Sequence, residues 1–510
     1  MDDRWSAAWR LLPEYLGAHV LLSAAALALG FLIAAPLAVL ASRNHAVRVT
    51  ALGIAGLIQT IPSLALLALF YPLLLALSAL CHAVFGAGFS ALGFLPSLLA
   101  LTLYSMLPIL RNGVAALRGV PKGLDEAGRS LGFSGWQRLL LIEAPVASPV
   151  FMAGVRTSAV WVVGTATLAT PVGQTSLGNY IFTGLQTENW VFVIFGCVAS
   201  AGLALIADGL LALIESGAEK SDGKRMLIGF AGLLLGTAAA AAPLIHPAQA
   251  TYVVGAKNFS EQFTLAAVIE KRIAGAGAKT DLREGLGSAV AFRALAANDI
   301  DVYVDYSGTL WTNVLNRKDS PPRAEMLTEL TRELKRRYGV TVVGPLGFEN
   351  AYALAMTQTR ADALHIRSIA DLATVAPKLI MGADVEFFSR PEWSKLDAAY
   401  GLNFKAKKSF QPTFMYHALE SGDVDVISAF SSDGRIAADH LVVLTDPKNA
   451  IPPYDAVILV APKRANDQRL LNALRPLVNS ITVEQMRTAN YAVDGKGETA
   501  AQAAQSLARH

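Results

Sequence analysis

Cysteine is almost absent from this chain. Its 510 residues contain only Cys81 and Cys197, and both lie in apolar stretches. Two such residues provide no disulfide framework, so the sequence gives no argument about the redox compartment. The eight histidines form no metal-ligand spacing and no catalytic constellation. We therefore expect no metal site and no catalytic residues.

Charge is also scarce. Asp, Glu, Lys and Arg make up 16% of the residues, and the net charge of +3 gives no reason to expect a nucleic-acid partner. The mean hydropathy of +0.41 is typical of a membrane protein. This average covers two unlike halves, because residues 1–245 are rich in Leu, Ala, Val and Gly, whereas residues 252–510 have the composition of a soluble α/β domain.

A phosphate-binding loop is missing. The nearest approach is residues 275–280, but a P-loop requires Gly directly before Lys, and Ala278 stands there. We expect no cofactor and no ATPase in this chain. Any ATP hydrolysis would require a separate subunit.

The N-terminal half contains long apolar runs. Each is near or above the roughly 20 residues that span a bilayer. The second run contains Pro62 and Pro72, so we expect it to be kinked or broken. The runs cover residues 18–41, 50–81, 91–110, 150–170, 189–214 and 226–245.

Basic residues between the runs predict the topology, because cytoplasmic loops are enriched in Lys and Arg. The loops near 82–90 and 171–188 contain neither residue, so we assign them to the outside. This alternation predicts a multi-pass protein of the inner (plasma) membrane with residues 251 onward outside the cytoplasm. The loops assigned to the cytoplasm contain Arg43 and Arg48; Arg111, Arg118, Lys122, Arg129 and Arg138; and Lys220, Lys224 and Arg225.

The sixth run resembles a secretory signal peptide inside the chain. It has Lys224 and Arg225 before an apolar core and ends in Ala248-Gln249-Ala250. It either stays as a sixth span or is cut after Ala250, and we favour the uncut anchor. Both alternatives leave residues 251–510 outside the cytoplasm.

Residues 125–154 are the one charged, amphipathic stretch in the interior of the apolar half. A charge at the bilayer centre costs roughly 2.5–3.5 kcal/mol or more, so Glu126 and Arg129 predict a structured loop at a membrane face. Gly132 allows a sharp turn between two short helices. Pro145, followed by a second proline at 149, is expected to end the second helix.

This stretch resembles the cytoplasmic coupling loop of ABC-importer permeases. The resemblance rests on Glu126, Ala127, Gly132, Pro145, Pro149 and Gly154, with Gly128 replacing the second Ala of the family pattern. It implies a loop over residues 114–150 that docks on a separate ABC ATPase subunit through Glu126, Ala127 and Gly132. It also implies that two copies of the chain line one pore. The alternative is an ordinary polar loop between spans.

The following span, residues 154–173, is rich in small residues, which let helices approach closely or line a narrow path. Arg156, with the threonines at 165, 167 and 170, could face a translocation route. Helix packing is the alternative.

The C-terminal half alternates strand-like runs with helical patterns, which indicates parallel sheets covered by helices. We expect two α/β lobes around a cleft, with crossovers at Pro345-Leu346-Gly347 and Pro452-Pro453. One lobe covers residues 252–344 and 446–508, and the other covers residues 345–445. The strand-like runs begin at Thr251 and recur at 301–304, 340–343, 351–356, 378–382, 424–428, 441–444 and 456–460.

Several motifs in this half resemble the binding proteins of osmoprotectant importers, over nearly all of residues 252–508. The whole chain resembles a permease fused to its own binding protein, as in some osmoprotectant and ergothioneine importers. The implied fold is an all-α transmembrane permease of the type I importer kind (1–220), a sixth span or anchor (221–250), and a two-lobed, type II binding-protein domain (251–510). The motifs are KNFSEQF (257–263), DVYVDYSGT (301–309), GFENAYA (347–353), QPTFMYHALESG (411–422), SAFSSDGRI (428–436) and PPYD (452–455).

The resemblance implies an aromatic cage of Tyr306, Tyr352 and Tyr416, with Phe430 where Tyr is frequent. Gln262 and Thr309 match positions that hydrogen-bond the polar end of the ligand. A trimethylammonium group has no N–H to donate, so ring faces suit it, at about 2 kcal/mol for each desolvated contact. The alternative for each ring is core packing, which we expect for Tyr303 and for Phe387, Phe388 and Trp393. Arg435 is expected to hold an acid such as Asp433.

The sequence therefore favours a transporter subunit for glycine betaine, choline or carnitine. Ergothioneine or a cationic amino acid is an alternative cargo for the same machine. A ligand-sensing receptor or a channel is the alternative from another class. A receptor would need a cytoplasmic signalling domain, and a channel would not need residues 126–154.

Overall fold

The computed structural model describes residues 3–85, 89–187, 189–245, 252–317, 319–384, 386–448 and 450–507. The chain forms two compact units, Met1–Ile181 with Phe192–Ala248 and Phe182–Val191 with Gln249–His510. Each unit has its own hydrophobic core. The alternative cut after Ala250 lies outside the described residues.

The first unit is built from helices. Six stretches of the described chain are long and apolar enough to cross a membrane: Arg4–Arg43, Ser63–Phe85, Phe94–Arg118, Gly135–Val172, Trp190–Glu219 and Gly223–Ala242. The predicted helical, multi-pass architecture is therefore confirmed. The helices are α1 (Asp3–Arg43), α2 (His45–Thr60), α3 (Ser63–Phe85), α4 (Phe94–Arg118), α5 (Lys122–Ser130), α6 (Gly135–Arg138), α7 (Ala144–Ala166), α8 (Gly178–Gln186), α9 (Trp190–Glu219) and α10 (Gly223–Ile245).

The second apolar run is broken at the position that Pro62 predicts. Helix α2 ends at Thr60 and α3 begins at Ser63. Asn44 caps the start of α2, because its side chain accepts the backbone N–H groups of Ala46 and Val47 at 2.9 and 3.3 Å. With 16 residues, α2 is shorter than a typical span, so α3 is the spanning part of this run.

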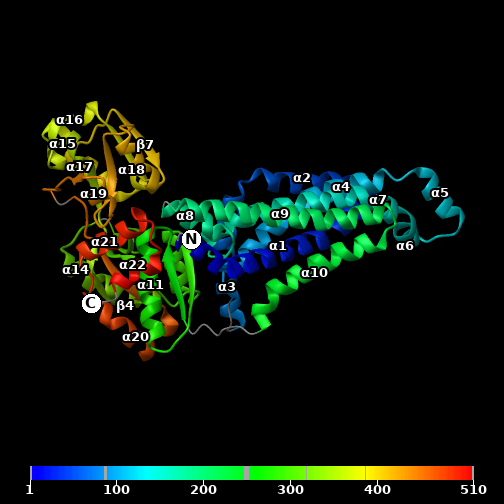
Figure 1. Ribbon diagram of the computed structural model, residues 1–510, viewed down its shortest axis with the longest axis horizontal. Coiled ribbons are helices and arrows are strands. Elements are labelled where there is room, and N and C mark those ends of the chain that lie inside the picture. The colour runs from blue at the N-terminus through cyan, green and yellow to red at the C-terminus, as the bar shows by residue number, and fades with distance from the viewer. Residues whose placement is uncertain are drawn as a thin grey trace. The chain divides into compact units, whose positions relative to one another are not determined.

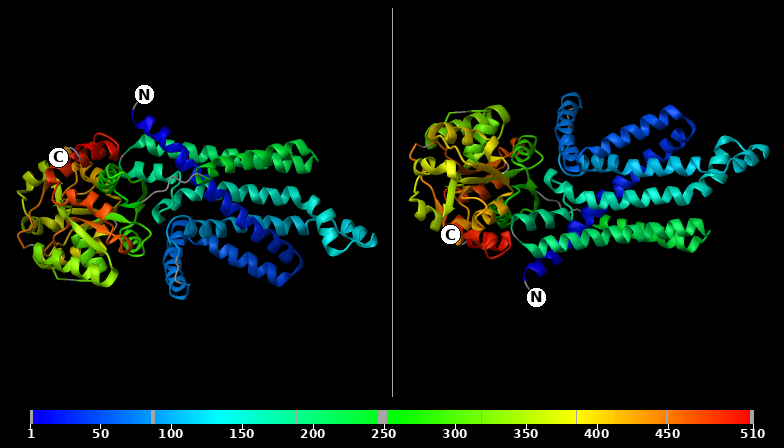
Figure 2. Two further views of the ribbon diagram at one scale, coloured as in Figure 1. Left: turned by 90° about the horizontal axis from the view of Figure 1, so that it is seen from below. Right: turned by 90° about the horizontal axis from the view of Figure 1, so that it is seen from above.

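Helix α4 is central to the first unit. It packs against α1 and α7, and α4 and α7 lie side by side in Figure 1 and in both views of Figure 2. Gly154 of α7 permits the close approach, because a Cβ there would lie 2.7 Å from the Pro108 carbonyl oxygen of α4. The small residue at this position is therefore explained by helix packing.

Arg156 and Thr170 are both engaged by neighbouring helices. The Arg156 guanidinium forms ion pairs with Asp208 at 2.8 Å and Glu215 at 2.7 Å, both on α9. Thr170 is buried, and its hydroxyl donates to the Asn179 side-chain oxygen at 3.1 Å. These contacts favour the packing alternative for both residues, since a charge in an apolar span needs a partner.

The second unit contains two five-stranded sheets. The first has the order β2-β1-β3-β10-β4 and the second β7-β6-β8-β5-β9. The strands are β1 (Tyr252–Lys257), β2 (Thr280–Leu286), β3 (Val302–Tyr306), β4 (Thr341–Glu349), β5 (Tyr352–Thr357), β6 (Ile380–Asp384), β7 (Ala406–Phe410), β8 (Val426–Phe430), β9 (Leu441–Val443) and β10 (Asp455–Val460).

The prediction of parallel sheets is wrong in part, because both sheets are mixed. Strand β10 runs antiparallel to β3 and β4, and β5 runs antiparallel to β8 and β9. Strands β5 and β10 each follow a passage from the other lobe, and such a passage does not impose the parallel direction of a βαβ unit. Edge strands β2 and β7 went unpredicted, since β7 reads Ala-Lys-Lys-Ser-Phe and charged edges lack an apolar signature.

The passage between the sheets lies later than predicted. Strand β4 pairs with β10 as far as Glu349 opposite Asp455, and β5 begins at Tyr352. The chain therefore changes lobe at residues 350–351, a few residues after the predicted boundary at 345. It returns after β9, through the segment that holds Pro452 and Pro453, to β10 at Asp455.

Helices cover both sheets, and Figure 1 shows α15–α18 around the second sheet and α11 with α20–α22 around the first. The apolar faces of these elements form the core of the unit. The helices are α11 (Ser260–Gly275), α12 (Ser288–Ala296), α13 (Ser307–Thr309), α14 (Arg323–Tyr338), α15 (Gln358–Leu364), α16 (Ile369–Val375), α17 (Pro391–Tyr400), α18 (Pro412–Glu420), α19 (Arg435–Ala438), α20 (Gln468–Leu474), α21 (Val483–Asp494) and α22 (Ala500–Leu507).

Candidate ligand-binding cleft and coupling hairpin

A cavity of about 330 Å³ lies between the two lobes of the second unit. The first lobe contributes the β1–α11 turn, the end of β3 and residues of α21. The second lobe contributes the end of β6, the segment that follows it and the end of β8. A concave site of this size at a junction of lobes is suited to a small molecule.

Three of the predicted cage rings line this cavity, namely Tyr306, Tyr352 and Phe430. Tyr352 on β5 is directly opposite Phe430 on β8, and their ring centroids are 5.0 Å apart. Residues opposite each other on paired antiparallel strands present their side chains on the same face. The ring of Tyr454 lies edge-on to Tyr352 at 6.0 Å. The pairing register of β5 and β8 therefore brings the rings of Tyr352 and Phe430 together at the cavity.

Tyr306 supplies a ring from the first lobe and is held by its hydroxyl group. It ends β3, and its hydroxyl donates to Glu261 Oε1 at 2.6 Å and accepts from Gln262 Nε2 at 3.0 Å. Phe259 stacks on its ring at 6.2 Å. Gln262 is buried and does not line the cavity, so it contacts Tyr306 rather than the cavity.

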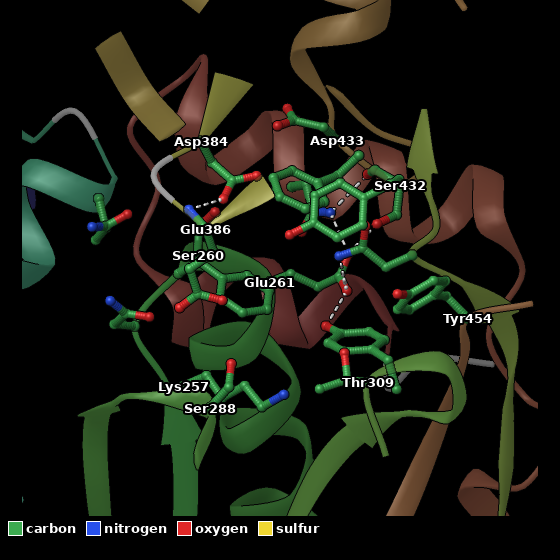
Figure 3. Close-up of a pocket in the computed structure, with 18 of the residues that line it drawn as sticks. Lys257, Ser260, Glu261, Ser288, Thr309, Asp384, Glu386, Ser432, Asp433 and Tyr454 are labelled. Atoms are coloured by element: carbon green, nitrogen blue, oxygen red, sulfur yellow. Dashed lines mark hydrogen bonds between the residues drawn. The ribbon is translucent and has the colours of Figure 1, made fainter. Parts of the chain in front are cut away.

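Tyr416 lies behind the cavity wall. It is buried, and the Arg435 guanidinium covers its ring at 4.0 Å from the centroid. Arg435 itself lines the cavity and binds Asp433 at 2.7 and 3.0 Å, as predicted for this pair. Thr309 lines the cavity (Figure 3). The structure therefore brings four of the six predicted residues to the cavity and places Tyr416 and Gln262 behind it.

Glu261 is a buried carboxylate at the meeting point of the lobes. Four side chains donate to it: Tyr306 and Asn350 to Oε1 at 2.6 and 3.1 Å, and Ser432 and Asn490 to Oε2 at 2.5 and 2.8 Å. Burial raises the pKa of this carboxyl, and the four hydrogen bonds oppose the rise. The donors come from both lobes and the passage between them, so Glu261 ties these segments together (Figure 3).

The three cations that line the cavity all have carboxylate partners. Lys257 is paired with the buried Asp305, Arg390 with Glu392 at 3.2 Å, and Arg435 with Asp433. Buried charges require such partners, because desolvation of a lone ion is costly. The positive charge at the cavity wall is therefore largely neutralised within the protein.

The cavity lining is acidic overall. Among its described residues, three are basic (Lys257, Arg390, Arg435) and five are acidic (Glu261, Asp384, Glu386, Asp433, Asp494), which is a formal excess of two negative charges. An acidic cavity attracts a cationic ligand.

Sequence reasoning missed several lining residues. Phe259, Glu261 and Tyr454 lie inside motifs that were recognised, but only positions matching the family's cage or its hydrogen-bonding residues were selected from them. Arg390 and Asp384 flank the aromatic pair at 387–388, where no spacing pattern indicates a site. Strand ends were the available signal, since Asp384 ends β6 as Tyr306 ends β3 and Phe430 ends β8.

The predicted coupling stretch forms a helical hairpin at one end of the first unit (Figure 1). Helix α5 ends at Ser130, Gly132 takes a left-handed φ of +77°, and α6 begins after Ser134. Ser134 and Gln137 form a reciprocal capping box. The two short helices and the glycine turn agree with the prediction. Glu126 and its neighbour at 127 are exposed on α5.

Packing explains the departure from the family pattern at Gly128. This glycine is buried, and a Cβ on it would lie 2.6 Å from Ile142 Cδ1.

The prediction that Pro145 ends the second helix is wrong. A π-helical turn, Leu139–Glu143, leads directly into α7, so the helix continues through Pro145 instead of ending there. Pro149 lies inside α7.

Known families match both units. Residues 250–508 match the substrate-binding domain of the ABC-type glycine betaine transport system, and residues 26–220 match the inner-membrane component of binding-protein-dependent transport systems. The chain belongs to this ABC importer family. It joins the permease and the substrate-binding domain of an importer in one polypeptide, as the sequence predicted.

Individual relatives share this organisation in whole or in part. The importer is 28% identical over 473 residues to the ergothioneine transport permease/ergothioneine binding protein of Helicobacter pylori, covering 89% of this chain and 82% of the relative. It is 40% identical over 199 residues to the glycine betaine/carnitine/choline transport system permease of Bacillus subtilis, covering 39% and 84%. A solved glycine betaine/carnitine/choline ABC transporter structure aligns at 28% identity and TM-score 0.45, covering 50% of this chain and 97% of that one.

Proposed function

We propose that this importer chain captures quaternary-amine osmoprotectants, such as glycine betaine, choline or carnitine, and passes them through its own permease domain. The observation that carries the proposal is the cavity between the lobes, lined by Tyr306, Tyr352 and Phe430 and by an excess of acidic residues. Tyr416 and Gln262 act from behind the wall, by supporting Arg435 and Tyr306.

The chemistry of the ligand suits this wall. A trimethylammonium group has a diffuse positive charge and no N–H, so it gains more from ring faces than from a single carboxylate. A desolvated cation–π contact contributes about 2 kcal/mol. Because Tyr306 belongs to one lobe and Tyr352 with Phe430 to the other, the ligand makes its full set of contacts only when the lobes are closed. Binding therefore favours the closed domain.

Ergothioneine, itself a trimethylated betaine, is a second candidate. The observation that favours it is the Helicobacter pylori relative, which is named for ergothioneine and matches 89% of this chain across both domains. A cationic amino acid is a third candidate, supported by the acidic lining alone.

Calorimetric titration of the full chain in detergent tests the proposal. Glycine betaine, choline, carnitine, ergothioneine and arginine are titrated separately, and binding of at least one trimethylated ligand is expected. Binding of arginine alone would overturn the aromatic cage. The variant Tyr352→Ala should weaken binding of the trimethylated ligands by about 30-fold or more and leave the thermal unfolding of the permease domain unchanged.

A separate ABC ATPase subunit drives transport in this proposal and docks on Glu126, Ala127 and Gly132. The hairpin exposes apolar side chains next to these residues, with exposed fractions of 72% at Leu131 and 68% at Trp136. Exposed apolar surface of this kind is typical of a docking site. Cysteine at position 126 should crosslink to the ATPase subunit in membranes, and a cysteine at exposed Glu420 should not.

Two copies of the chain form one pore in this proposal, because a single permease domain offers one coupling hairpin. Light scattering of the detergent-purified protein should give the mass of two 54.0 kDa chains. The binding domain faces the outside of the membrane, as the basic loops indicate. Added protease should therefore digest residues 252–507 in intact spheroplasts, and protection would contradict this orientation.

A further inference from the structure

Buried acceptor oxygens without a hydrogen-bond partner occur among the described residues of the cleft. They are Asp384 Oδ2, Asn350 Oδ1 and Asn490 Oδ1, and all three residues line the cavity. Their residues are 6%, 9% and 3% exposed. An unsatisfied buried acceptor costs about 1–3 kcal/mol, so a native structure rarely leaves several in one place without a reason.

The orientation of the two amides follows from their partners. Asn350 Nδ2 donates to Glu261 Oε1 at 3.1 Å, and Asn490 Nδ2 donates to Glu261 Oε2 and to the Ser432 carbonyl, both at 2.8 Å. A flipped amide would direct an oxygen at the Glu261 carboxylate, which only accepts when ionised. The free oxygens are therefore fixed away from Glu261, with their acceptor capacity unused.

Asp384 is the strongest of the three acceptors. It ends β6, and its Oδ1 accepts the backbone N–H groups of Glu386 at 2.9 Å and Phe387 at 3.1 Å, which fixes the direction of the carboxylate. Figure 3 shows the bond from Glu386 to one oxygen. The other oxygen, Oδ2, is the one without a partner. Because backbone N–H groups already bind Oδ1, Oδ2 is the oxygen that can accept a hydrogen bond from a ligand in the cavity.

Among the buried side-chain atoms of the cleft, the unused hydrogen-bonding capacity is thus on the acceptor side. The described lining residues leave buried acceptors without hydrogen bonds, whereas the buried side-chain nitrogens that make none, Arg138 Nε and Arg272 Nε, lie outside the lining, and Arg138 Nε is ion-paired with Asp125 at 3.3 Å. A ligand that only accepts hydrogen bonds cannot satisfy such a site. Glycine betaine has a carboxylate and a trimethylammonium group and donates none. Choline and carnitine donate one O–H, and ergothioneine donates from its ring nitrogens.

We propose that the cleft selects quaternary amines that also carry an N–H or O–H donor, and that Asp384 Oδ2 is the principal acceptor of that donor. The inference rests on the proposed function, since the rings hold the methylated end of the same ligand. A site built to accept a donor rejects the analogue that lacks it, because its buried acceptor then stays unpaired. Within this ligand class, glycine betaine is accordingly bound more weakly than choline, carnitine or ergothioneine.

The test compares ligands that carry the donor with ligands that lack it, and choline and its O-methyl ether differ in the donor alone. Choline is compared with its O-methyl ether, and ergothioneine with glycine betaine, by calorimetric titration of the full chain in detergent. A hydrogen bond to a charged acceptor corresponds to about ten- to a hundredfold in affinity. The methyl ether and glycine betaine should bind more weakly than their partners by about that factor.

The variant Asp384→Asn then separates a hydrogen bond from simple charge attraction. The substitution keeps the shape of the side chain and removes the charge. The affinity for choline and ergothioneine should fall by about ten- to a hundredfold, and the affinity for the methyl ether and glycine betaine should change less than threefold. Glu420→Gln, the same change at an exposed position of the same lobe, is the matched control.

The outcomes separate this inference from the proposed function. Equal weakening of all four ligands by Asp384→Asn would mean that Asp384 supplies only charge, and the inference is overturned while the cage stands. Equal binding of glycine betaine and ergothioneine to the unaltered chain also overturns it. Failure of every quaternary amine to bind would overturn the proposed function itself. Thermal unfolding of each variant shows whether the domain is folded.

Discussion

Tyr306 allows the ring and the hydroxyl group of a cage residue to be tested separately. The hydroxyl donates to Glu261 at 2.6 Å, while the ring lines the cavity. The variant Tyr306→Phe removes the hydrogen bond and keeps the ring. A bond to a charged acceptor contributes about 1.5–3 kcal/mol. This variant should lower the free energy of unfolding of the binding domain by about that amount and change ligand affinity less than threefold.

The variant Tyr306→Ala removes the ring as well. Loss of one desolvated cation–π contact of about 2 kcal/mol corresponds to about 30-fold in affinity, since 1.4 kcal/mol is a factor of ten. The dissociation constant for the tightest trimethylated ligand should therefore rise by about 30-fold or more. Calorimetric titration of the full chain gives the affinity, and thermal unfolding of the same samples gives the stability.

Tyr303→Phe is the matched control for this series. Tyr303 lies on the same strand, is fully buried, and donates its hydroxyl to Asp305 at 2.5 Å, but it does not line the cavity. Its substitution should lower stability and leave affinity unchanged. The reasoning is refuted if Tyr306→Phe weakens binding as much as Tyr306→Ala, because the hydroxyl and not the ring face would then hold the ligand. An unchanged affinity in Tyr306→Ala would refute it equally.

Other predictions concern coupling and pH. Glu126→Ala should spare ligand binding, measured by calorimetry, and abolish uptake of labelled ligand by cells; normal uptake would remove the coupling role. Gly128→Ala places a Cβ 2.6 Å from Ile142 and should reduce uptake several-fold at unchanged affinity, whereas Gly123→Ala, whose Cβ would meet no atom within 4 Å, should not. Burial and the nearby Glu386 raise the pKa of Asp384, although two backbone N–H groups and Arg390 oppose the rise. Because only the ionised carboxylate binds a donor strongly, affinity for choline should fall as pH drops through this raised pKa, and Asp384→Asn should remove the fall; a pH profile identical in both proteins would contradict this.

Patterns of hydrophobicity were sufficient to predict the two-part architecture. The long apolar runs and the broken second run follow from span length and from Pro62, which are local properties. The mixed sheets could not be predicted this way. The direction of a strand depends on the lobe from which the chain enters it, as for β10 after Pro452 and Pro453. No local sequence pattern encodes this path.

The cleft was predicted only in part, for reasons of side-chain direction and partner choice. Tyr352 and Phe430 could be expected together, because both are aromatic residues at strand ends beside turn residues. Tyr416 looks equivalent in sequence, yet the Arg435 side chain lies over its ring, and this depends on the tertiary packing. Gln262 follows Glu261 on α11, and consecutive side chains of a helix point in different directions. Glu261 therefore lines the cavity, whereas Gln262 lies behind it.

Proton NMR of a bound trimethylated ligand tests the central claim most directly. The account holds that the methyl groups lie against the faces of Tyr306, Tyr352 and Phe430. Ring currents should then move the N-methyl resonance of the bound ligand upfield, with nuclear Overhauser contacts to aromatic protons that disappear in Tyr352→Ala. A bound ligand whose N-methyl resonance stays at its free position, without contacts to aromatic protons, would contradict the account.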